Sequence, residues 1–206
     1  MDDKDKVKWI YSSKDNQELT ERYDEWAKDY DSYLEREHSY EGPQLTAGFF
    51  TRYVPKTARV LDAGAGTGLM GEVLAKLGYS EIVAIDLSDG MLKEARNKRV
   101  YKELKQMVLG EALDFADKSF DAVVSVGTFT MAHAPASSFD ELIRITRTGG
   151  YIIFTLSAEA YEKSGFKEKF AALESTNRWK FIEKSKSQEI SHGSVVKHRV
   201  WVFQVI

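Results

Sequence analysis

The sequence predicts an α/β domain in which helices flank a mostly parallel β-sheet with one reversed strand, preceded by N-terminal helices. Three observations support this fold class. Apolar, strand-like runs alternate with helical patterns from residue 59 to about residue 156, as in repeated βα units. A helical pattern with an aromatic face precedes the first unit. After the last unit, residues 179–190 and 198–206 are typical of two strands joined by a loop at 192–194, which predicts a hairpin at one sheet edge.

Before the sheet, the chain predicts a tail and two helices. Residues 1–16 are polar and are expected to form a flexible tail. Residues 18–37 have a helical pattern, and residues 45–53 predict a second helix. Within the first of these helices, aromatic and apolar residues recur every three or four positions and therefore share one face. These residues are Tyr23, Trp26, Tyr30, Tyr33 and Leu34. We therefore expect a single domain with N-terminal helices over 17–54 and a sheet core over 55–206.

The core region predicts five strands with helices between them. The expected strands cover residues 59–63, 81–87, 106–109, 120–126 and 151–156. The expected helices cover residues 69–77, 89–98, 138–146 and 159–174. Three details favour these boundaries. Ser88 stands at an N-cap position, Ser138 and Glu141 have capping-box spacing, and Gly78 suits the C-terminus of a helix.

The composition argues against several classes of function. The 206 residues include no cysteine, so disulfides, thiolate metal sites and cysteine nucleophiles are excluded. The formal charge of −3 argues against a dedicated nucleic-acid-binding protein. No apolar run approaches the roughly 20 residues of a membrane span, and the charged start argues against a secretory signal. We therefore expect a cytoplasmic protein with no membrane partner, and no ligand spacing in the sequence predicts a metal site.

The most informative motif runs from Asp62 to Gly68 and reads D-A-G-A-G-T-G, directly after the first expected strand. Glycines let a ligand approach the backbone closely, and the N-terminus of the following helix offers unpaired N–H groups. About twenty residues further on, the next strand ends in Asp86, whose carboxylate can accept hydrogen bonds from ribose hydroxyls. Together these features predict an adenosine-type ligand at the C-terminal ends of the first two strands.

Two departures from the dinucleotide-binding pattern favour a ligand without phosphate. A G-x-G-x-x-G loop requires a glycine at position 69, where this chain has Leu69. The carboxylate of Asp62 would repel a pyrophosphate, whereas it could hold an amino group. Two alternatives to this interpretation remain. One is an NAD(P)-dependent oxidoreductase, which these departures disfavour, and the other is a tight turn that binds no ligand.

Four segments resemble the class I S-adenosylmethionine-dependent methyltransferases. V-L-D-A-G-A-G-T-G over residues 60–68 is similar to the first motif of that family, and I-D-L-S-D-G-M-L over residues 85–92 is similar to the segment that follows it. Residues 110–125 resemble the next motif. Residues 23–31, Y-D-E-W-A-K-D-Y-D, resemble the N-terminal helix of many members that act on small molecules. The overall likeness extends to the Williams–Beuren syndrome region methyltransferase-like proteins.

The resemblance implies a Rossmann-like three-layer sandwich around a seven-stranded sheet, with S-adenosylmethionine as the cofactor. The N-terminal helices would cover the cofactor as a lid. Asp62 would lie near the amino group of the methionine portion, and Asp86 would bind the ribose. The other predicted cofactor-binding residues are Tyr23, Trp26, Tyr30, Gly64, Ala65, Gly66, Gly68, Leu69, Leu87, Met91, Glu111, Ala112, Leu113, Val126 and Gly127. Glu111 stands where the family most often has aspartate.

The resemblance also implies methyl transfer to a small-molecule nucleophile by in-line displacement, which needs a general base only if the nucleophile arrives protonated. His133 follows the fourth expected strand and is the candidate catalytic residue, because an imidazole is suited to take a proton near neutral pH. The alternative is a packed or solvent-facing loop histidine. A protein side chain is a second candidate acceptor, and a non-catalytic S-adenosylmethionine-binding protein is a further alternative. The sequence leaves the acceptor atom and the oligomeric state open.

Overall fold

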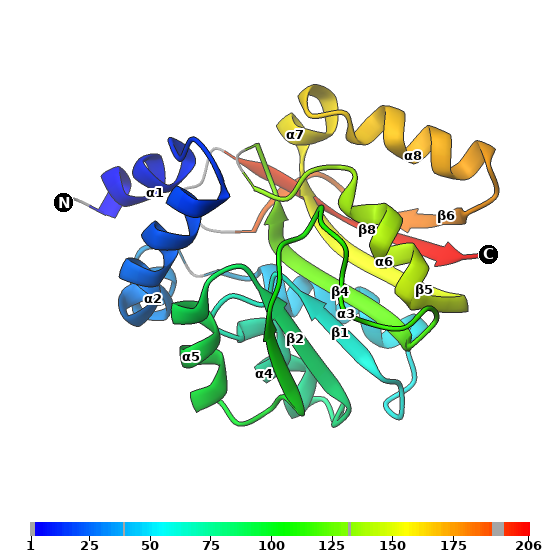
Figure 1. The fold of residues 1–206 in the computed structure, drawn as a ribbon, viewed down its shortest axis with the longest axis horizontal. Helices are drawn as coiled ribbons and strands as arrows, with labels where there is room; N and C mark the ends of the chain where they lie inside the picture. The colour runs from blue at the N-terminus through cyan, green and yellow to red at the C-terminus, as the bar shows by residue number, and fades with distance from the viewer. Residues whose placement is uncertain (1–2, 39, 132, 191–195) are drawn as a thin grey trace.

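The computed structural model describes residues 3–38, 40–131, 133–190 and 196–206. Figure 1 shows a central sheet with helices on both faces and further helices at one end. The helices are α1 (Asp3–Tyr11), α2 (Asn16–His38), α3 (Gly42–Tyr53), α4 (Leu69–Lys76), α5 (Asp89–Asn97), α6 (Ser138–Ile145), α7 (Ala158–Lys163) and α8 (Phe166–Ser175). The strands are β1 (Val60–Ala63), β2 (Ile82–Asp86), β3 (Glu103–Gln106), β4 (Phe120–Phe129), β5 (Thr146–Ser157), β6 (Trp179–Lys184), β7 (Gln188–Glu189) and β8 (Lys197–Val205).

The described strands form one sheet in the order β3-β2-β1-β4-β5-β8-β6, and the two-residue β7 pairs with β8. Neighbours from β3 to β5 are parallel. The C-terminal β8 is antiparallel to β5 and to β6, between which it lies. The predicted fold class, a mostly parallel seven-stranded sheet with a reversed C-terminal strand, is therefore confirmed. The loop predicted at 192–194 lies outside the described residues.

The central strands β1 and β2 are buried along their whole length because helices cover both faces of the sheet. On one face, α6 and α8 contribute Phe139 and Phe170 to a core that includes a stack of Trp179 on Phe203, with ring centroids 3.8 Å apart. On the other face, α3 and α4 bury side chains such as Phe50 against β1 and β4. Every helix in the described ranges is too short or too polar to span a lipid bilayer.

The N-terminal region corrects one prediction and confirms two. We expected residues 1–16 to form a flexible tail, whereas the structure contains the helix α1. Its residue Ile10 is 1% exposed and packs in a cluster with Leu19 and Trp26 of α2. The segment is polar apart from a few apolar positions, so its periodicity was too weak to predict the helix. The predicted helices over 18–37 and 45–53 are present as α2 and α3.

Three predictions in the core region are also corrected. The third strand covers 103–106 instead of 106–109, so the apolar residues 107–109 lie beyond its C-terminal end. The helix expected over 159–174 is broken into α7 and α8 at Gly165, which has a φ of 75°. The side chain of Glu141 makes no capping box, because its carboxylate accepts hydrogen bonds from the N–H of Leu113 and from Arg144.

Candidate cofactor and substrate pocket

One pocket lies at the C-terminal ends of β1, β2 and β4, where the sheet order reverses between β1 and β4. This is the position at which open α/β sheets bind their ligands. The empty space at this pocket is about 950 Å³ when the open solvent at its mouth is included. The pocket is lined by Asn16, Leu19, Tyr23, Tyr30, Tyr40, Pro43, Asp62, Gly64, Ala65, Gly66, Thr67, Leu69, Met70, Asp86, Leu87, Met91, Met107, Val108, Leu109, Val126, Gly127, Thr128, His133 and Ala134.

The glycine turn between β1 and α4 forms the floor of this pocket. Gly64 has a φ of 74°, and a Cβ built on it would meet the Oγ1 of Thr128 at 2.4 Å. The turn could therefore not approach β4 so closely with a side chain at this position. At Gly66, by contrast, a Cβ would meet no heavy atom within 4 Å. The bare backbone at Gly66 consequently borders open space, as a surface that receives a ligand requires.

The carboxylate of Asp86 joins the glycine turn to the end of β2. One oxygen accepts a hydrogen bond from the N–H of Gly66 at 2.8 Å, and the other accepts from the N–H of Ser88 at 2.9 Å. Burial raises the pKa of this carboxyl group, although the backbone donors oppose the shift. Each carboxylate oxygen can accept more than one hydrogen bond, so Asp86 retains acceptor capacity toward the pocket.

Asp62, the last but one residue of β1, is 1% exposed and has an unusual set of partners. Its Oδ2 accepts a hydrogen bond from the hydroxyl of Tyr101 at 2.7 Å. Its Oδ1 makes no hydrogen bond of normal geometry within the described part of the chain. Burial raises the pKa of Asp62 to about 7, against the opposing effects of the Tyr101 hydroxyl and the Gly71 N–H. A buried carboxylate oxygen without a partner is the kind of group that a cationic ligand completes.

Two aspartates of α2 attach this helix to the pocket rim. The Oδ1 of Asp24 accepts hydrogen bonds from the Ser88 hydroxyl at 2.6 Å and from the Gly90 N–H at 2.7 Å. Further along the helix, Asp31 accepts a hydrogen bond from the Thr67 hydroxyl and pairs with Lys98 at 2.8 Å. The helix thus contacts both the glycine turn, which forms the pocket floor, and the N-terminus of α5.

The aromatic residues of α2 divide between the pocket and the core. Tyr23 and Tyr30 line the pocket, as predicted for a lid. Trp26 does not: it is 5% exposed and packs against Tyr30 and Tyr33, with ring centroids 4.9 and 5.0 Å apart. Tyr40 also lines the pocket, although no sequence motif indicates it. Its hydroxyl would lie 2.9 Å from a Cβ built on Gly127.

His133 lies in the loop after β4 and lines the pocket. Its Nε2 is 2.6 Å from the hydroxyl of Tyr23, and its Nδ1 is 2.5 Å from the Oγ1 of Thr130. Burial lowers the pKa of His133 to about 4, so the imidazole is neutral near neutral pH and one ring nitrogen carries a lone pair. The ring is therefore held in a fixed position and is neutral, and its lowered pKa makes it a weak base in the protein without ligands.

Most predicted site residues are brought together, and five are not. Like Trp26, Gly68 does not line the pocket. It is the N-cap residue of α4, and a Cβ built on it would contact Tyr101 and Ala95. The predicted adenine-edge residues Glu111 and Ala112 are exposed, and Leu113 is buried in the core. These three residues are absent from the described pocket lining, which includes residues 107–109.

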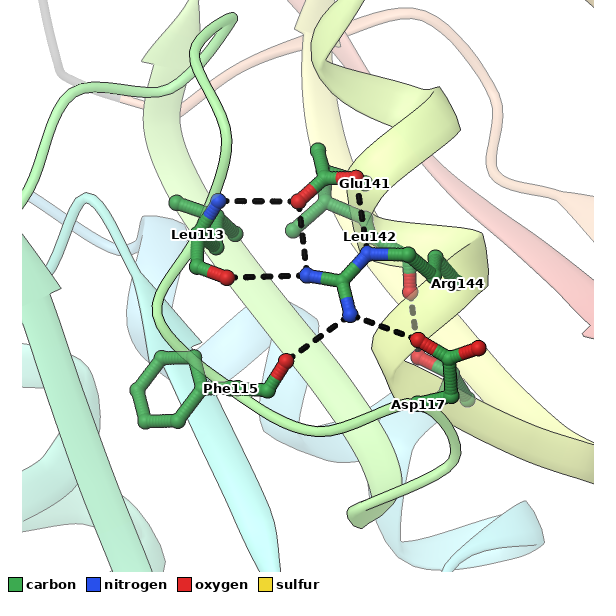
Figure 2. Close-up of polar contacts among 7 residues, drawn as sticks. Leu113, Phe115, Asp117, Glu141, Leu142 and Arg144 are labelled. Carbon is green, nitrogen blue, oxygen red and sulfur yellow. Dashed lines mark hydrogen bonds and ion pairs between the residues drawn. The ribbon is translucent and has the colours of Figure 1, made fainter.

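Arg144 explains why Leu113 is turned away from the pocket (Figure 2). Its guanidinium donates hydrogen bonds to the backbone carbonyls of Leu113 and Phe115, both at 2.8 Å, and pairs with Asp117 and Glu141. Glu141 in turn accepts from the Leu113 N–H at 2.8 Å. These contacts fix the segment against α6. The apolar residues 107–109 predict a strand, so the sequence alone does not indicate that they line a pocket.

The described residues contain no group of three or more His, Cys, Asp or Glu side chains that could hold a metal ion.

Comparison with known proteins places this site in a family. Residues 61–154 match the model of a methyltransferase domain. Methyltransferase-like protein 27 of Homo sapiens is 31% identical over 164 residues, which cover 76% of this chain and 66% of the human protein. Malonyl-[acyl-carrier protein] O-methyltransferase of Methylococcus capsulatus is 36% identical over 123 residues, covering 58% of this chain and 44% of that protein. The chain thus spans between 44% and 66% of the length of these two relatives.

A solved structure gives the same result for the fold. A TehB-like S-adenosylmethionine-dependent methyltransferase from Corynebacterium glutamicum superposes with a TM-score of 0.65 at 19% identity, over 90% of this chain and 99% of that chain. Residues 61–154 of the chain thus match a methyltransferase domain, and the chain has the fold of the S-adenosylmethionine-dependent methyltransferases, a class whose cofactor is S-adenosylmethionine.

Proposed function

We propose that this chain binds S-adenosylmethionine in the pocket and transfers its methyl group to a small-molecule nucleophile by in-line displacement. The observation that carries the proposal is the arrangement of two buried carboxylates, Asp62 and Asp86, on either side of a glycine turn with open space at Gly66. A nucleoside with a positively charged amino end and no phosphate matches this arrangement, since a pyrophosphate would meet two negative groups.

The lining residues fit the parts of the cofactor. Asp86 would hold the ribose hydroxyls, and the buried Oδ1 of Asp62 would accept from the amino group. Leu87 and Met91, together with residues 107–109, supply apolar surface for the adenine ring. Gly64, Ala65, Val126 and Gly127 border the region between the two ends.

The bound cofactor supplies an electrophilic methyl group, and the protein contributes orientation, exclusion of water and proton transfer. The helix α2 covers the pocket through Tyr23 and Tyr30 and is held by the aspartate contacts described above. His133 is the candidate to take a proton from a hydroxyl or ammonium acceptor, and this role requires the bound ligands to raise its pKa from about 4 toward the working pH. The relative named malonyl-[acyl-carrier protein] O-methyltransferase supports an oxygen atom as the nucleophile.

Calorimetric titration tests the cofactor part of this proposal. The protein should bind S-adenosylhomocysteine and should show no binding of NAD. Asp86→Asn should weaken S-adenosylhomocysteine binding by about 10- to 100-fold, the expected loss when hydrogen bonds to a charged group are removed. Asp89→Asn is the matched control, because the Asp89 side chain is half-exposed at the start of α5 and its one ion pair among the described residues is with Lys93. Uptake of NAD in preference to S-adenosylhomocysteine would contradict the proposal.

A screen of metabolite extracts with a labelled methyl donor addresses the acceptor. Label is expected to appear in a small molecule. Label that appears only in protein would contradict the small-molecule part of the proposal and favour a protein side chain as the acceptor.

A further inference from the structure

Tyr101 lies in the segment between α5 and β3 and makes its hydrogen bond to Asp62 without lining the pocket itself. It is therefore a neighbour of the proposed cofactor site that has no direct access to the ligand. Its hydroxyl donates to Oδ2 of Asp62, so that Oδ1 is the carboxylate oxygen without a hydrogen-bond donor among the residues that the structure describes. The two carboxylate oxygens of Asp62 therefore differ in their hydrogen bonding because of Tyr101, and not because of the glycine motif.

Two glycines make room for the Tyr101 ring. A Cβ built on Gly71 would lie 2.2 Å from the Tyr101 hydroxyl oxygen, and one built on Gly68 would lie 3.0 Å from its Cε2. Distances this short require the ring to move. The third glycine of the motif, which lies outside the pocket lining, thus faces the tyrosine that contacts Asp62. Gly68 and Gly71 are therefore coupled to the cofactor site through Tyr101.

We propose that Tyr101 is a positioning residue that holds the Asp62 carboxylate with Oδ1 available to a protonated amino group, and thereby selects ligands that carry one. This inference rests on the proposed function, because S-adenosylmethionine is the amino-bearing ligand concerned. The hydroxyl of Tyr101 acts in two ways. It fixes the orientation of the carboxylate, and as a donor it favours the ionised form that an ammonium group requires.

The test compares two ligands that differ at the amino end. S-adenosylhomocysteine carries the amino acid portion, whereas 5′-methylthioadenosine has the same nucleoside without it. In Tyr101→Phe, the affinity for S-adenosylhomocysteine should fall about 10-fold at neutral pH, as expected for loss of a hydrogen bond to a charged group. The affinity for 5′-methylthioadenosine should stay unchanged. Both are measured by calorimetric titration of the full chain.

The pH dependence provides a second readout that a purely structural role would not change. The pKa of Asp62 in the free protein is about 7, so S-adenosylhomocysteine affinity should rise between about pH 6 and about pH 8 as the carboxylate ionises. Without the Tyr101 hydroxyl, the ionised form is less favoured. In Tyr101→Phe, the rise in affinity should therefore occur at higher pH. The difference in affinity between this variant and the wild type should become smaller as the pH increases.

Two further variants control the result. Tyr79→Phe removes the hydroxyl of another buried tyrosine, which donates to the carbonyl of Val54 at 2.6 Å and lies outside the pocket lining. It should leave both affinities unchanged. Gly71→Ala displaces the Tyr101 ring while retaining its hydroxyl, and should reproduce the selective loss of S-adenosylhomocysteine binding.

The outcomes separate this inference from the proposed function. Equal losses for the two ligands in Tyr101→Phe, or an unchanged affinity for S-adenosylhomocysteine, would overturn the role of Tyr101 while leaving the proposed function intact. Wild-type protein that binds neither compound would overturn the proposed function and this inference together.

Discussion

The hydroxyl of Tyr23 lies 2.6 Å from Nε2 of His133, which connects the helix α2 to the loop after β4. The two residues are 110 positions apart in the sequence. Since Tyr23 belongs to the proposed lid and His133 is the candidate base, the position of the base depends on whether α2 is in place. This contact is the structural basis of the first prediction.

His133→Ala should lower turnover by about 100-fold, in the range observed for loss of a general base. The affinity for S-adenosylhomocysteine should change by less than about 2-fold, because the proton transfer concerns the acceptor. Steady-state kinetics and calorimetry measure the two effects. Tyr23→Phe, which keeps the ring and removes the hydroxyl, should cause a smaller loss. Unchanged turnover in His133→Ala would remove the histidine from the mechanism.

His133 should also make stability depend on pH. Burial lowers its pKa from 6.5 to about 4 in the folded state, so between these values the unfolded chain binds more protons than the folded one. Stability contributed by the neutral histidine is therefore present above about pH 6.5 and is lost as the pH falls toward about 4. The free energy of unfolding of wild type minus that of His133→Gln should decrease from pH 7 to pH 5 in urea titrations. A difference independent of pH would contradict the burial of a neutral imidazole.

Gly90→Ala should displace α2 from the pocket rim. A Cβ at this position would lie 2.7 Å from the Cα of Asp24, and backbone cannot yield as a flexible side chain does. We expect S-adenosylhomocysteine affinity to fall by about 10-fold or more, because the lid would no longer seat over the pocket. Gly48→Ala is the control, since a Cβ there meets nothing within 4 Å. Equal affinities for the two variants would show that cofactor binding does not require α2 in this position.

Arg144→Ala should destabilise the fold by about 2–3 kcal/mol, because it removes the donor to the carbonyls of Leu113 and Phe115 and the cation paired with Glu141. Arg147→Ala is the matched control. Arg147 is half exposed and pairs only with Asp121 in the described structure, so its loss should cost less than about 1 kcal/mol. Chemical denaturation compares the two variants. Equal effects would mean that the segment anchored by Arg144 is held by its apolar contacts alone.

The sequence predicted those parts of the fold and site that depend on short-range patterns. The glycine turn, Asp86 and the cap at Ser88 follow from local chemistry, and the structure contains the Ser88 hydrogen bond to the Met91 N–H. The alternation of strands and helices predicted the sheet. His133 was singled out by its position after a strand, and it does line the pocket.

The failures concern contacts between segments that are distant in the sequence. The orientation of Leu113 is determined by Arg144 and Glu141 on α6, which no local pattern indicates. Trp26 lies on the predicted helix face, yet a helix face is wide enough to contact both the core and the pocket. The role of Tyr101 was also invisible, because its partner Asp62 is 39 positions away.

The position of β8 has a consequence for how the chain reaches its native state. β6 pairs only with β8 in the described structure, and β5 needs β8 to cover its outer side. Until residues 197–205 are inserted, two strands therefore offer unpaired backbone groups, which invite association between chains. The pairing of β5 with β8 is a non-local contact of the kind that slows folding. A version of the protein that lacks this strand should accumulate in aggregates, whatever the state of its cofactor site.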